Sequence, residues 1–231
     1  MVTQRIIGLT GGIASGKSLV ANYLHQQHYL VISDADIHAR EAVALGSPIL
    51  QRIHQRYGGQ ILLLDGSLDR QRLGQIIFSQ PPEKLWLEQQ IHPFVRQRLE
   101  QSISQTAATT LVLVVPLLIE ADMMDLVTEV WLVTCDPDQQ IARLTTRDGL
   151  TIAAAQARIN SQMSIAQKIP FADVVLKNTS SPESLLKQVD TALVGVHLNS
   201  ATLTLNPRQF GIRISPHPPT PSPLVGEGEK D

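Results

Sequence analysis

The sequence predicts an α/β fold in which a five-stranded parallel sheet lies between two layers of helices, a three-layer α/β/α arrangement. Five short apolar segments have the length of buried strands, at 5–10, 29–33, 110–115, 128–135 and 172–178. Helical patterns separate them, which favours parallel pairing with helices on both faces. The 231 residues are 43% hydrophobic and 17% charged, a composition that suits a buried core.

In the first half of the chain, a glycine-rich turn joins the first strand to a helix. The turn begins at Gly11, and a helix is expected over 17–27, before the second strand. From about 36 to 104 the pattern is mostly helical. Ser79 and the Pro81-Pro82 pair predict the start of a helix whose apolar residues recur at helical spacing.

In the second half, capping residues predict where helices begin and end. Asp136 is the expected N-cap of a helix with Pro137 in its first position, and this helix is expected to stop at Gly149. Another helix begins after Thr151. Ser181 is the expected N-cap of the closing helix, which follows the fifth strand.

Charge, cysteine content and apolar runs exclude several classes of partner. A net charge of −2 gives no strong field toward nucleic acid or an anionic membrane, so neither is expected as a partner. The single cysteine, Cys135, is expected to be buried at a strand end and fits a reducing compartment. No signal peptide is recognisable, and the apolar run at 111–119 is about half the length of a membrane helix. We expect a cytoplasmic protein, either a monomer or a weak homo-oligomer.

The stretch RIIGLTGGIASGKSL, residues 5–19, contains a phosphate-binding pattern in which four residues separate Gly11 from Gly16-Lys17-Ser18. Between a strand and a helix, glycines let backbone N–H groups approach phosphate oxygens, and the helix N-terminus favours negative charge. Lys17 is expected to bridge the terminal phosphates of a nucleoside triphosphate, and the Ser18 hydroxyl to ligate Mg²⁺. The expected nucleotide-binding residues of the loop are Gly11, Gly12, Ala14, Ser15, Gly16, Lys17, Ser18 and Leu19.

The segments after the loop favour phosphoryl transfer to a small molecule over hydrolysis. The guanine-reading and Asp-x-x-Gly motifs of switch GTPases are missing from the sequence. ATPase motors usually carry an acidic residue directly at a strand end, whereas here the third strand ends at Pro116 and Glu120 comes four residues later. A small-molecule kinase is the leading hypothesis; a nucleoside or nucleotide kinase and a non-catalytic nucleotide-binding module are the alternatives.

Two carboxylates and a group of arginines could serve a kinase. Asp34 and Asp36 follow the second strand, at the sheet edge where ligands bind in α/β proteins, and in an extended chain they would point the same way; helix N-capping is the alternative. Arg143 and Arg147 are four apart on one predicted helix, and Arg158 is on the next. This helical pair could close over phosphates as a lid, or present a solvated face.

Seven motifs together resemble one family, the dephospho-coenzyme A kinases. They are GLTGGIASGKS, DADIHAR, IHPFVR, VVPLLIE, RLTTRDGLT, ARINSQM and ADVVLKN, in the family's order and spacing between about 5 and 195. The resemblance implies a phosphate-loop kinase with a helical substrate-binding insertion and a lid. It implies transfer of the γ-phosphate of ATP, with Mg²⁺, to the ribose 3′-hydroxyl of dephospho-CoA, the last step of coenzyme A synthesis.

The motifs also imply roles for individual residues. Asp36 matches the catalytic carboxylate near the hydroxyl, with Asp34 as its substrate-side partner. Lys17 acts on the phosphates, and Arg143 and Arg147 match the lid arginines, so these three are the other expected catalytic residues.

Further positions match the substrate side of the family's site, and one, Asn178, matches its nucleotide side. Arg40, His92 and Arg96 fall in its substrate-side helices, Glu120 follows the Pro-Leu-Leu turn beside the acceptor, and Asn178 borders the adenine end of ATP. The residue types leave other interpretations open. His92 could be a packed histidine, Glu120 could cap a turn, and the arginines could be partners in structural ion pairs.

The chain departs from the family pattern at several positions. Ala14 stands where the family usually has glycine, so we expect a negative φ there. Leu19 replaces a common threonine or serine, but its backbone N–H is kept. The segment 165–170 matches only loosely, although Lys168 is retained.

The resemblance divides the chain into a kinase domain at 1–196 and a tail. We expect a core at about 1–35, 108–142 and 170–196, with a helical insertion at about 36–107 and a lid at about 143–169. The Pro- and Gly-rich segment 197–231 is expected to be a disordered tail that is dispensable for activity; a docking peptide for a partner is the alternative.

Overall fold

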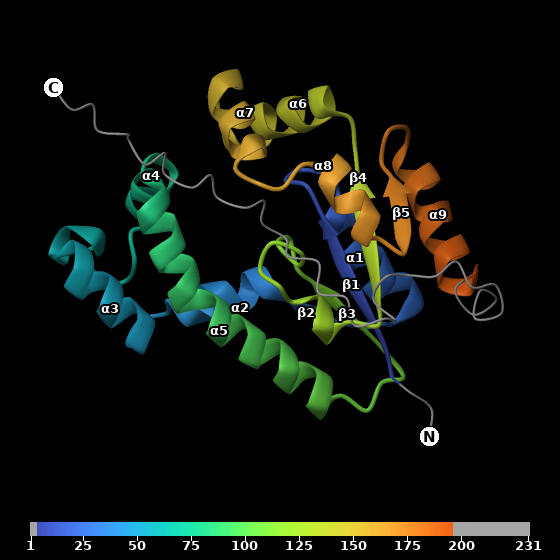
Figure 1. Cartoon of the computed structure of the whole chain (residues 1–231), viewed down its shortest axis with the longest axis horizontal. Helices are drawn as coiled ribbons and strands as arrows, with labels where there is room; N and C mark the ends of the chain where they lie inside the picture. The colour runs from blue at the N-terminus through green and yellow to red at the C-terminus, as the bar shows by residue number, and fades with distance from the viewer. Residues whose placement is uncertain (1–3, 196–231) are drawn as a thin grey trace, which may run out of the picture.

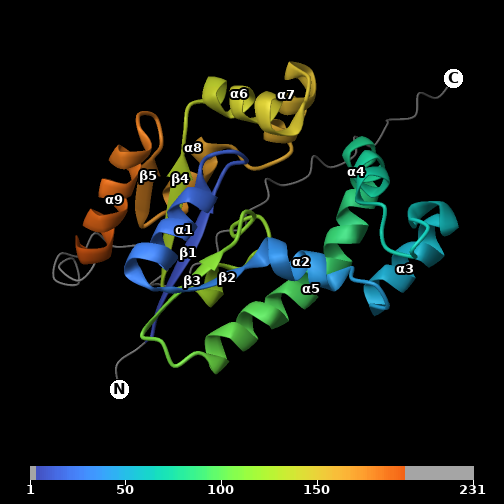
Figure 2. The same cartoon turned by 180° about the vertical axis from the view of Figure 1, so that it is seen from behind.

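The computed structural model describes residues 4–195 and contains one sheet of five parallel strands in the order β2-β3-β1-β4-β5 (Figures 1 and 2). The strands are β1 (Arg5–Gly11), β2 (Val31–Asp34), β3 (Thr110–Val114), β4 (Glu129–Thr134) and β5 (Val174–Lys177). In register, Ile7 of β1 lies between Val112 of β3 and Glu129 of β4. The predicted fold class is confirmed.

Helices join the strands and extend beyond the sheet. They are α1 (Lys17–His28), α2 (Ala35–Ala42), α3 (Pro48–Tyr57), α4 (Arg70–Ser79), α5 (Pro81–Gln105), α6 (Pro137–Asp148), α7 (Ile152–Asn160), α8 (Ile165–Lys168) and α9 (Pro182–Gly195), with short 3₁₀ turns η1 (Gly59–Ile61), η2 (Met124–Leu126) and η3 (Ile169–Phe171). Both views place α6 and α7 beyond one end of the sheet, and α3 and α4 to one side of it (Figures 1 and 2).

Strand alternation divides the core into two layers. Ile7 and Val112 point toward α1 and α9, where they pack with Leu24 and Val189. Residues of the opposite parity, such as Leu111, pack against α5 on the other face. This period of two is what two-sided burial of a parallel sheet requires.

The helices between β2 and β3 bury a third cluster away from the sheet. Ile53 of α3 and Ile61 of η1 are both 0% exposed, and they pack with Leu73 of α4 and Leu87 of α5. This segment therefore has a small core of its own, as an inserted helical unit needs.

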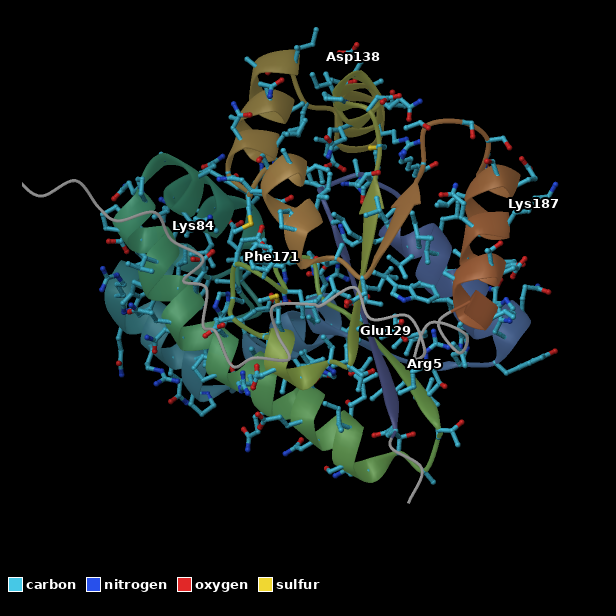
Figure 3. All side chains as sticks on the ribbon, turned by 45° about the vertical axis from the view of Figure 1, so that its right-hand side comes forward. Arg5, Lys84, Glu129, Asp138, Phe171 and Lys187 are labelled. Carbon is cyan, nitrogen blue, oxygen red and sulfur yellow. The ribbon has the colours of Figure 1, made fainter. Side chains whose placement is uncertain are left out.

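A buried ion pair ties the start of the sheet together. Arg5 of β1 and Glu129 of β4 form it, and their side chains point toward one another (Figure 3). The indole Nε1 of Trp131 donates to the second oxygen of Glu129 at 3.0 Å. Both carboxylate oxygens are thus satisfied, as burial of a charge requires.

Most predicted boundaries agree with the structure to within two residues, and two of the differences have clear local causes. The second strand begins at Val31 because Tyr29 takes a left-handed conformation, φ 54°, and ends α1. Ser79 does not start α5: it ends α4, and its hydroxyl donates to the carbonyl of Gln75. Asp136, Thr151 and Gly149 lie at the predicted helix ends, and Cys135 is buried as expected.

Two further expectations concern membranes and the tail. Within residues 4–195, no helix combines the length and the apolar character that crossing a membrane would require. The predicted tail at 197–231 lies outside the described residues.

Candidate active site

The loop between β1 and α1 needs glycine at two positions. Gly11 has φ 152° and Gly16 has φ 108°, both in a region that other residues rarely adopt. A Cβ on Gly11 would lie 2.3 Å from the carbonyl oxygen of Val133, and a Cβ on Gly16 would lie 2.4 Å from Nδ2 of Asn178. The loop therefore packs its backbone directly against β4 and the end of β5.

The expectation of a negative φ at Ala14 is wrong. Ala14 adopts φ 57°, a left-handed conformation. The alanine thus takes a conformation that is more usual for glycine. The strain is of the order of 1–2 kcal/mol, because a Cβ crowds the following carbonyl in this region.

Lys17 is held over the loop by two backbone carbonyls. Its Nζ donates to the carbonyls of Gly11 and Gly12, at 2.8 Å each. Burial in the loop, and secondarily the nearby charge of Lys168, lower the pKa of Lys17 to about 8. Burial thus disfavours the charged form of Lys17, and a bound anion would stabilise it.

Side chains from the second half of the chain hold the loop from outside. Nδ2 of Asn178, which is buried, donates to the carbonyl of Ser15 at 2.8 Å. Nη1 of Arg143 donates to the carbonyl of Ala14 at 3.1 Å. Asn178 and Arg143 therefore both contact the backbone of the loop.

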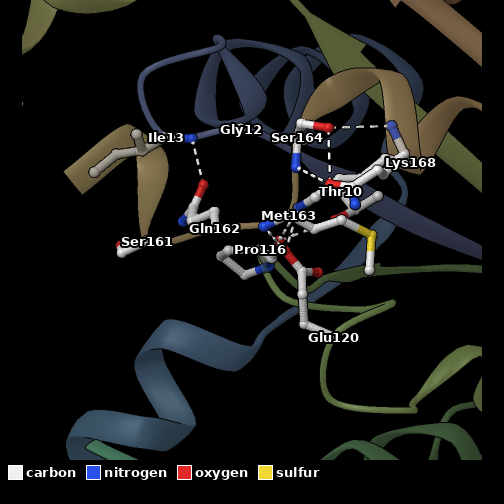
Figure 4. A network of polar contacts seen from close by, with 12 residues as sticks. Thr10, Gly12, Ile13, Pro116, Glu120, Ser161, Gln162, Met163, Ser164 and Lys168 are labelled. Atoms are coloured by element: carbon white, nitrogen blue, oxygen red, sulfur yellow. Dashed lines mark hydrogen bonds and ion pairs between the residues drawn. The ribbon is translucent and has the colours of Figure 1, made fainter. Parts of the chain in front are cut away.

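Two glutamines, Gln140 and Gln162, form hydrogen bonds with the backbone of Ile13, and neither was predicted as a site residue. Nε2 of Gln140 donates to the carbonyl of Ile13 at 2.7 Å. Oε1 of Gln162 accepts from the Ile13 N–H at 2.9 Å (Figure 4). Gln162 stands in the ARINSQM motif, which offered a signal. Gln140 had none, since a buried glutamine on α6 does not differ in pattern from an exposed one.

The two carboxylates after β2 have different positions. Asp34 is the N-cap of α2, and its Oδ1 accepts from the backbone N–H of Asp36 at 2.8 Å. Asp36 is in the first helical turn, so the expectation that the pair points the same way from extended chain is wrong. Burial, and then the charge of Asp34, raise the pKa of Asp36, while Lys17 and Arg40 oppose the shift. Asp36 thus holds its proton more readily than a free aspartate.

Asp36 lies where two cavities meet. A cleft of about 1000 Å³ is lined by the phosphate loop from Ile13 to Leu19, by Asp36 and by Arg143 and Arg147 of α6. A smaller, mostly apolar pocket of about 160 Å³ lies between α2, α5 and the turn after β3. Asp36, Pro116 and Leu117 line both cavities. Groups bound in the two spaces would therefore meet at Asp36.

The predicted lid arginines differ in their contacts. Arg143 touches the loop, whereas the guanidinium of Arg147 pairs with Asp148 at 2.7 Å while still lining the cleft. Arg158 of α7 also pairs with Asp148, at 3.2 Å. Asp148 thus connects α6 to α7 and leaves one face of Arg147 toward the cleft.

The predicted substrate-side residues are not all in one place. His92 lines the apolar pocket, and burial lowers its pKa. Arg40 is exposed on α2, close enough to Asp36 to affect its pKa. Arg96 pairs with Asp125 and with Glu100, the latter at 2.9 Å, which supports the ion-pair interpretation.

Glu120 is part of a buried network and does not cap the turn that follows it. Its Oε1 lies 2.7 Å from Nζ of Lys168 and accepts from the backbone N–H of Met163 at 3.2 Å (Figure 4). In the described part of the chain, Glu120 lines neither of the two cavities.

Within residues 4–195, His, Cys, Asp and Glu side chains form no group of three or more that could hold a metal ion. Ser18, the predicted Mg²⁺ ligand, is exposed and lines the cleft. Mg²⁺ at nucleotide sites typically takes one or two protein oxygens, together with phosphate and water. A lone hydroxyl at the start of α1 fits that chemistry.

Comparison with known proteins agrees with the geometry. A family model described as dephospho-CoA kinase matches residues 5–183. Proteins named dephospho-CoA kinase are 60% identical in Trichormus variabilis, over 83% of this chain and 98% of that one, and 52% identical in Synechococcus elongatus, over 82% and 91%.

Solved structures share the fold. A crystal structure of a Thermus thermophilus protein has a TM-score of 0.70 and 32% identity, and covers 87% of this chain and 100% of its own. The structure of a dephospho-CoA kinase from Campylobacter jejuni has a TM-score of 0.62 and 24% identity, over 86% and 100%, a likeness that concerns the fold alone.

Proposed function

We propose, since the chain belongs to the dephospho-CoA kinase family, that the larger cleft holds ATP and that Asp36 faces the ribose 3′-hydroxyl of dephospho-CoA. Members of this family catalyse ATP-dependent phosphorylation of dephospho-CoA, the last step of coenzyme A biosynthesis, and this chain is such a kinase. The observation that carries the site assignment is that Asp36 lines both the loop cleft and the apolar pocket.

On the donor side, the phosphate loop binds the triphosphate through its backbone. Lys17 gives up its contacts with Gly11 and Gly12 to reach the terminal phosphates, because phosphate oxygens are the stronger acceptors for an ammonium. The Ser18 hydroxyl would hold Mg²⁺, which supplies charge neutralisation on the β- and γ-phosphates when it is bound. Asn178 keeps the loop in shape and borders the nucleotide.

On the acceptor side, Asp36 orients the hydroxyl and takes its proton. The hydroxyl oxygen forms a bond to the γ-phosphorus while the bond from that phosphorus to the bridging oxygen of ADP breaks, and the proton passes to the Asp36 carboxylate. The apolar pocket receives an uncharged part of dephospho-CoA. His92, kept neutral by burial, is suited to such a pocket because it brings no charge into it.

Charge on the moving phosphoryl group is balanced by arginines of α6. Arg143 reaches the loop directly, and Arg147 lines the same cleft. We assign the segment 143–169 as the lid, 36–107 as the substrate-binding insertion and the remainder of 1–196 as the core. Asp34, Arg40 and Arg96 complete the substrate side; Arg96 would have to exchange Asp125 for a ligand phosphate.

We further propose that the protein acts in the cytoplasm as a monomer or weak homo-oligomer. Its one cysteine, Cys135, is buried and forms no disulfide within the chain, which is compatible with a reducing compartment.

The test is a coupled ADP-release assay with purified protein, ATP and Mg²⁺. Release should depend on dephospho-CoA and stop when coenzyme A, whose 3′-position is already phosphorylated, replaces it. Nucleosides and nucleoside monophosphates serve as alternative acceptors. Faster turnover with one of these would favour the nucleoside or nucleotide kinase, and ATP binding without transfer to any acceptor would favour a non-catalytic module.

A further inference from the structure

Lys168 is the one charged side chain among the largest fully buried residues that the structure describes. It ends the short helix α8, and its side chain is 0% exposed. Its Nζ lies 2.7 Å from Oε1 of Glu120 and donates to the carbonyl of Pro116 at 3.4 Å. Lysine is almost never buried unless it is paired, and apolar residues often replace a buried ion pair without loss of stability. Stability alone therefore does not account for this pair.

The ammonium of Lys168 joins three segments that are distant in sequence. It reaches both ends of the turn from Pro116 to Glu120, which follows β3 (Figure 4). Thr10 of β1 donates to the same Pro116 carbonyl at 3.1 Å. Glu120 also accepts from the N–H of Met163, in the segment between α7 and α8. Strand β1, the turn at 116–120 and the segment between α7 and α8, which forms the base of the proposed lid, are thus connected through Pro116, Glu120 and Lys168.

The turn held by Lys168 forms the wall between the two cavities. Pro116 and Leu117 line both the loop cleft and the apolar pocket, next to Asp36. Lys168 supplies the positive charge that balances the Glu120 carboxylate, whose other oxygen, Oε2, is buried without a hydrogen-bond partner in the described part of the chain. Without the ammonium, Pro116 would keep its contact with Thr10 and Glu120 its contact with the Met163 N–H, but the turn would be held less firmly.

We propose that Lys168 is a positioning residue for the phosphoryl transfer: through Glu120 and Pro116 it fixes the 116–120 turn against the base of the lid and so sets where the acceptor hydroxyl lies relative to Asp36. Lys168 itself does not touch the reacting atoms. A displacement of about 1 Å at a reacting centre can cost about 10²-fold in rate, so a small shift of Pro116 or Leu117 beside Asp36 would have a large effect. The inference rests on the proposed function.

The experiment compares Lys168→Met with the double variant Lys168→Met/Glu120→Gln, which removes both charges and keeps an acceptor for the Met163 N–H. The single variant should lose thermal stability, because it leaves a buried carboxylate unpaired, and the double variant should recover it. In both, kcat should fall by about 10–100-fold and the KM for dephospho-CoA should rise, while the KM for ATP stays within about threefold of the wild type. Lys187→Met, on the outer side of α9, is the matched control (Figure 3).

A double variant that recovers kcat together with thermal stability would show a purely structural pair and overturn the proposal. An unchanged kcat in Lys168→Met, or an equal rise of both KM values, would also overturn it. If neither variant folds, the pair is a folding requirement, which counts against a positioning role. A wild-type protein that does not phosphorylate dephospho-CoA would instead contradict the proposed function and can be recognised before any variant is made.

Discussion

The phosphate loop and the acceptor wall differ in how they are assembled. The loop is one contiguous segment with positive φ at Gly11, Ala14 and Gly16, although side chains from the second half of the chain also contact its backbone. The acceptor wall combines Asp36 of α2, side chains of α5 and the turn that begins at Pro116. The loop is local in sequence, and the wall exists only in the folded chain.

This difference predicts different responses to substitution. Changes in the loop should alter ATP binding, because the loop's contacts are to the donor. Changes at the wall should alter the acceptor and the chemical step, while ATP binding is kept. The two sides meet at Asp36 and Lys17, where the separation can be tested most directly.

Asp36→Asn should have the largest effect. The amide keeps the volume but does not take the hydroxyl proton, so kcat should fall by about 10²–10⁴-fold. The dissociation constant for ATP, measured by calorimetry, should stay close to the wild-type value. Asp138→Asn, at an exposed carboxylate on α6, is the control and should leave kcat unchanged (Figure 3). A near-normal kcat in Asp36→Asn would exclude the proton-acceptor role.

Lys17→Ala should affect both donor binding and turnover. The lost charged hydrogen bonds should weaken ATP binding by about 10–100-fold, and the lost stabilisation of the phosphates should lower kcat by about 10²–10³-fold. Steady-state kinetics with each substrate varied in turn will separate the two terms. If ATP affinity is retained while kcat falls, Lys17 does not contribute to donor binding, and the contrast between the phosphate loop and the acceptor wall is wrong at this residue.

Asp34→Asn should move a pH profile with a smaller loss of rate. Asparagine is as good an N-cap as aspartate, so α2 should keep its start. Burial and the charge of Asp34 raise the pKa of Asp36, against Lys17 and Arg40. A base acts when ionised, so kcat/KM for dephospho-CoA should be lost as the pH falls through this raised pKa. Without the Asp34 charge, that acidic limb should move to lower pH. A limb that stays in place would mean that another group controls it.

Sequence patterns predicted the contiguous parts of the molecule well. The strands, the loop and the helix ends at Asp136, Thr151 and Gly149 follow from local spacing and capping chemistry, and the structure has them. The ion pair between Lys168 and Glu120 could not be predicted, because the two residues are 48 positions apart and neither is part of a periodic pattern. The same holds for Gln140 at Ile13, a contact that depends on how α6 docks on the loop.

Ala14→Gly should have the smallest effect, although it lies in the loop. Glycine removes the strain of φ 57°, about 1–2 kcal/mol, but it adds conformational entropy to the unfolded chain, which costs about 0.5–1 kcal/mol. The second term offsets part of the first, so the free energy of unfolding should rise by about 0–1.5 kcal/mol, as measured by urea denaturation. The KM for ATP should stay within about twofold, since the backbone groups that the proposed function assigns to phosphate binding are kept. A clear loss of stability would mean that the Ala14 methyl group packs in the cleft, and that side chains as well as backbone shape this loop.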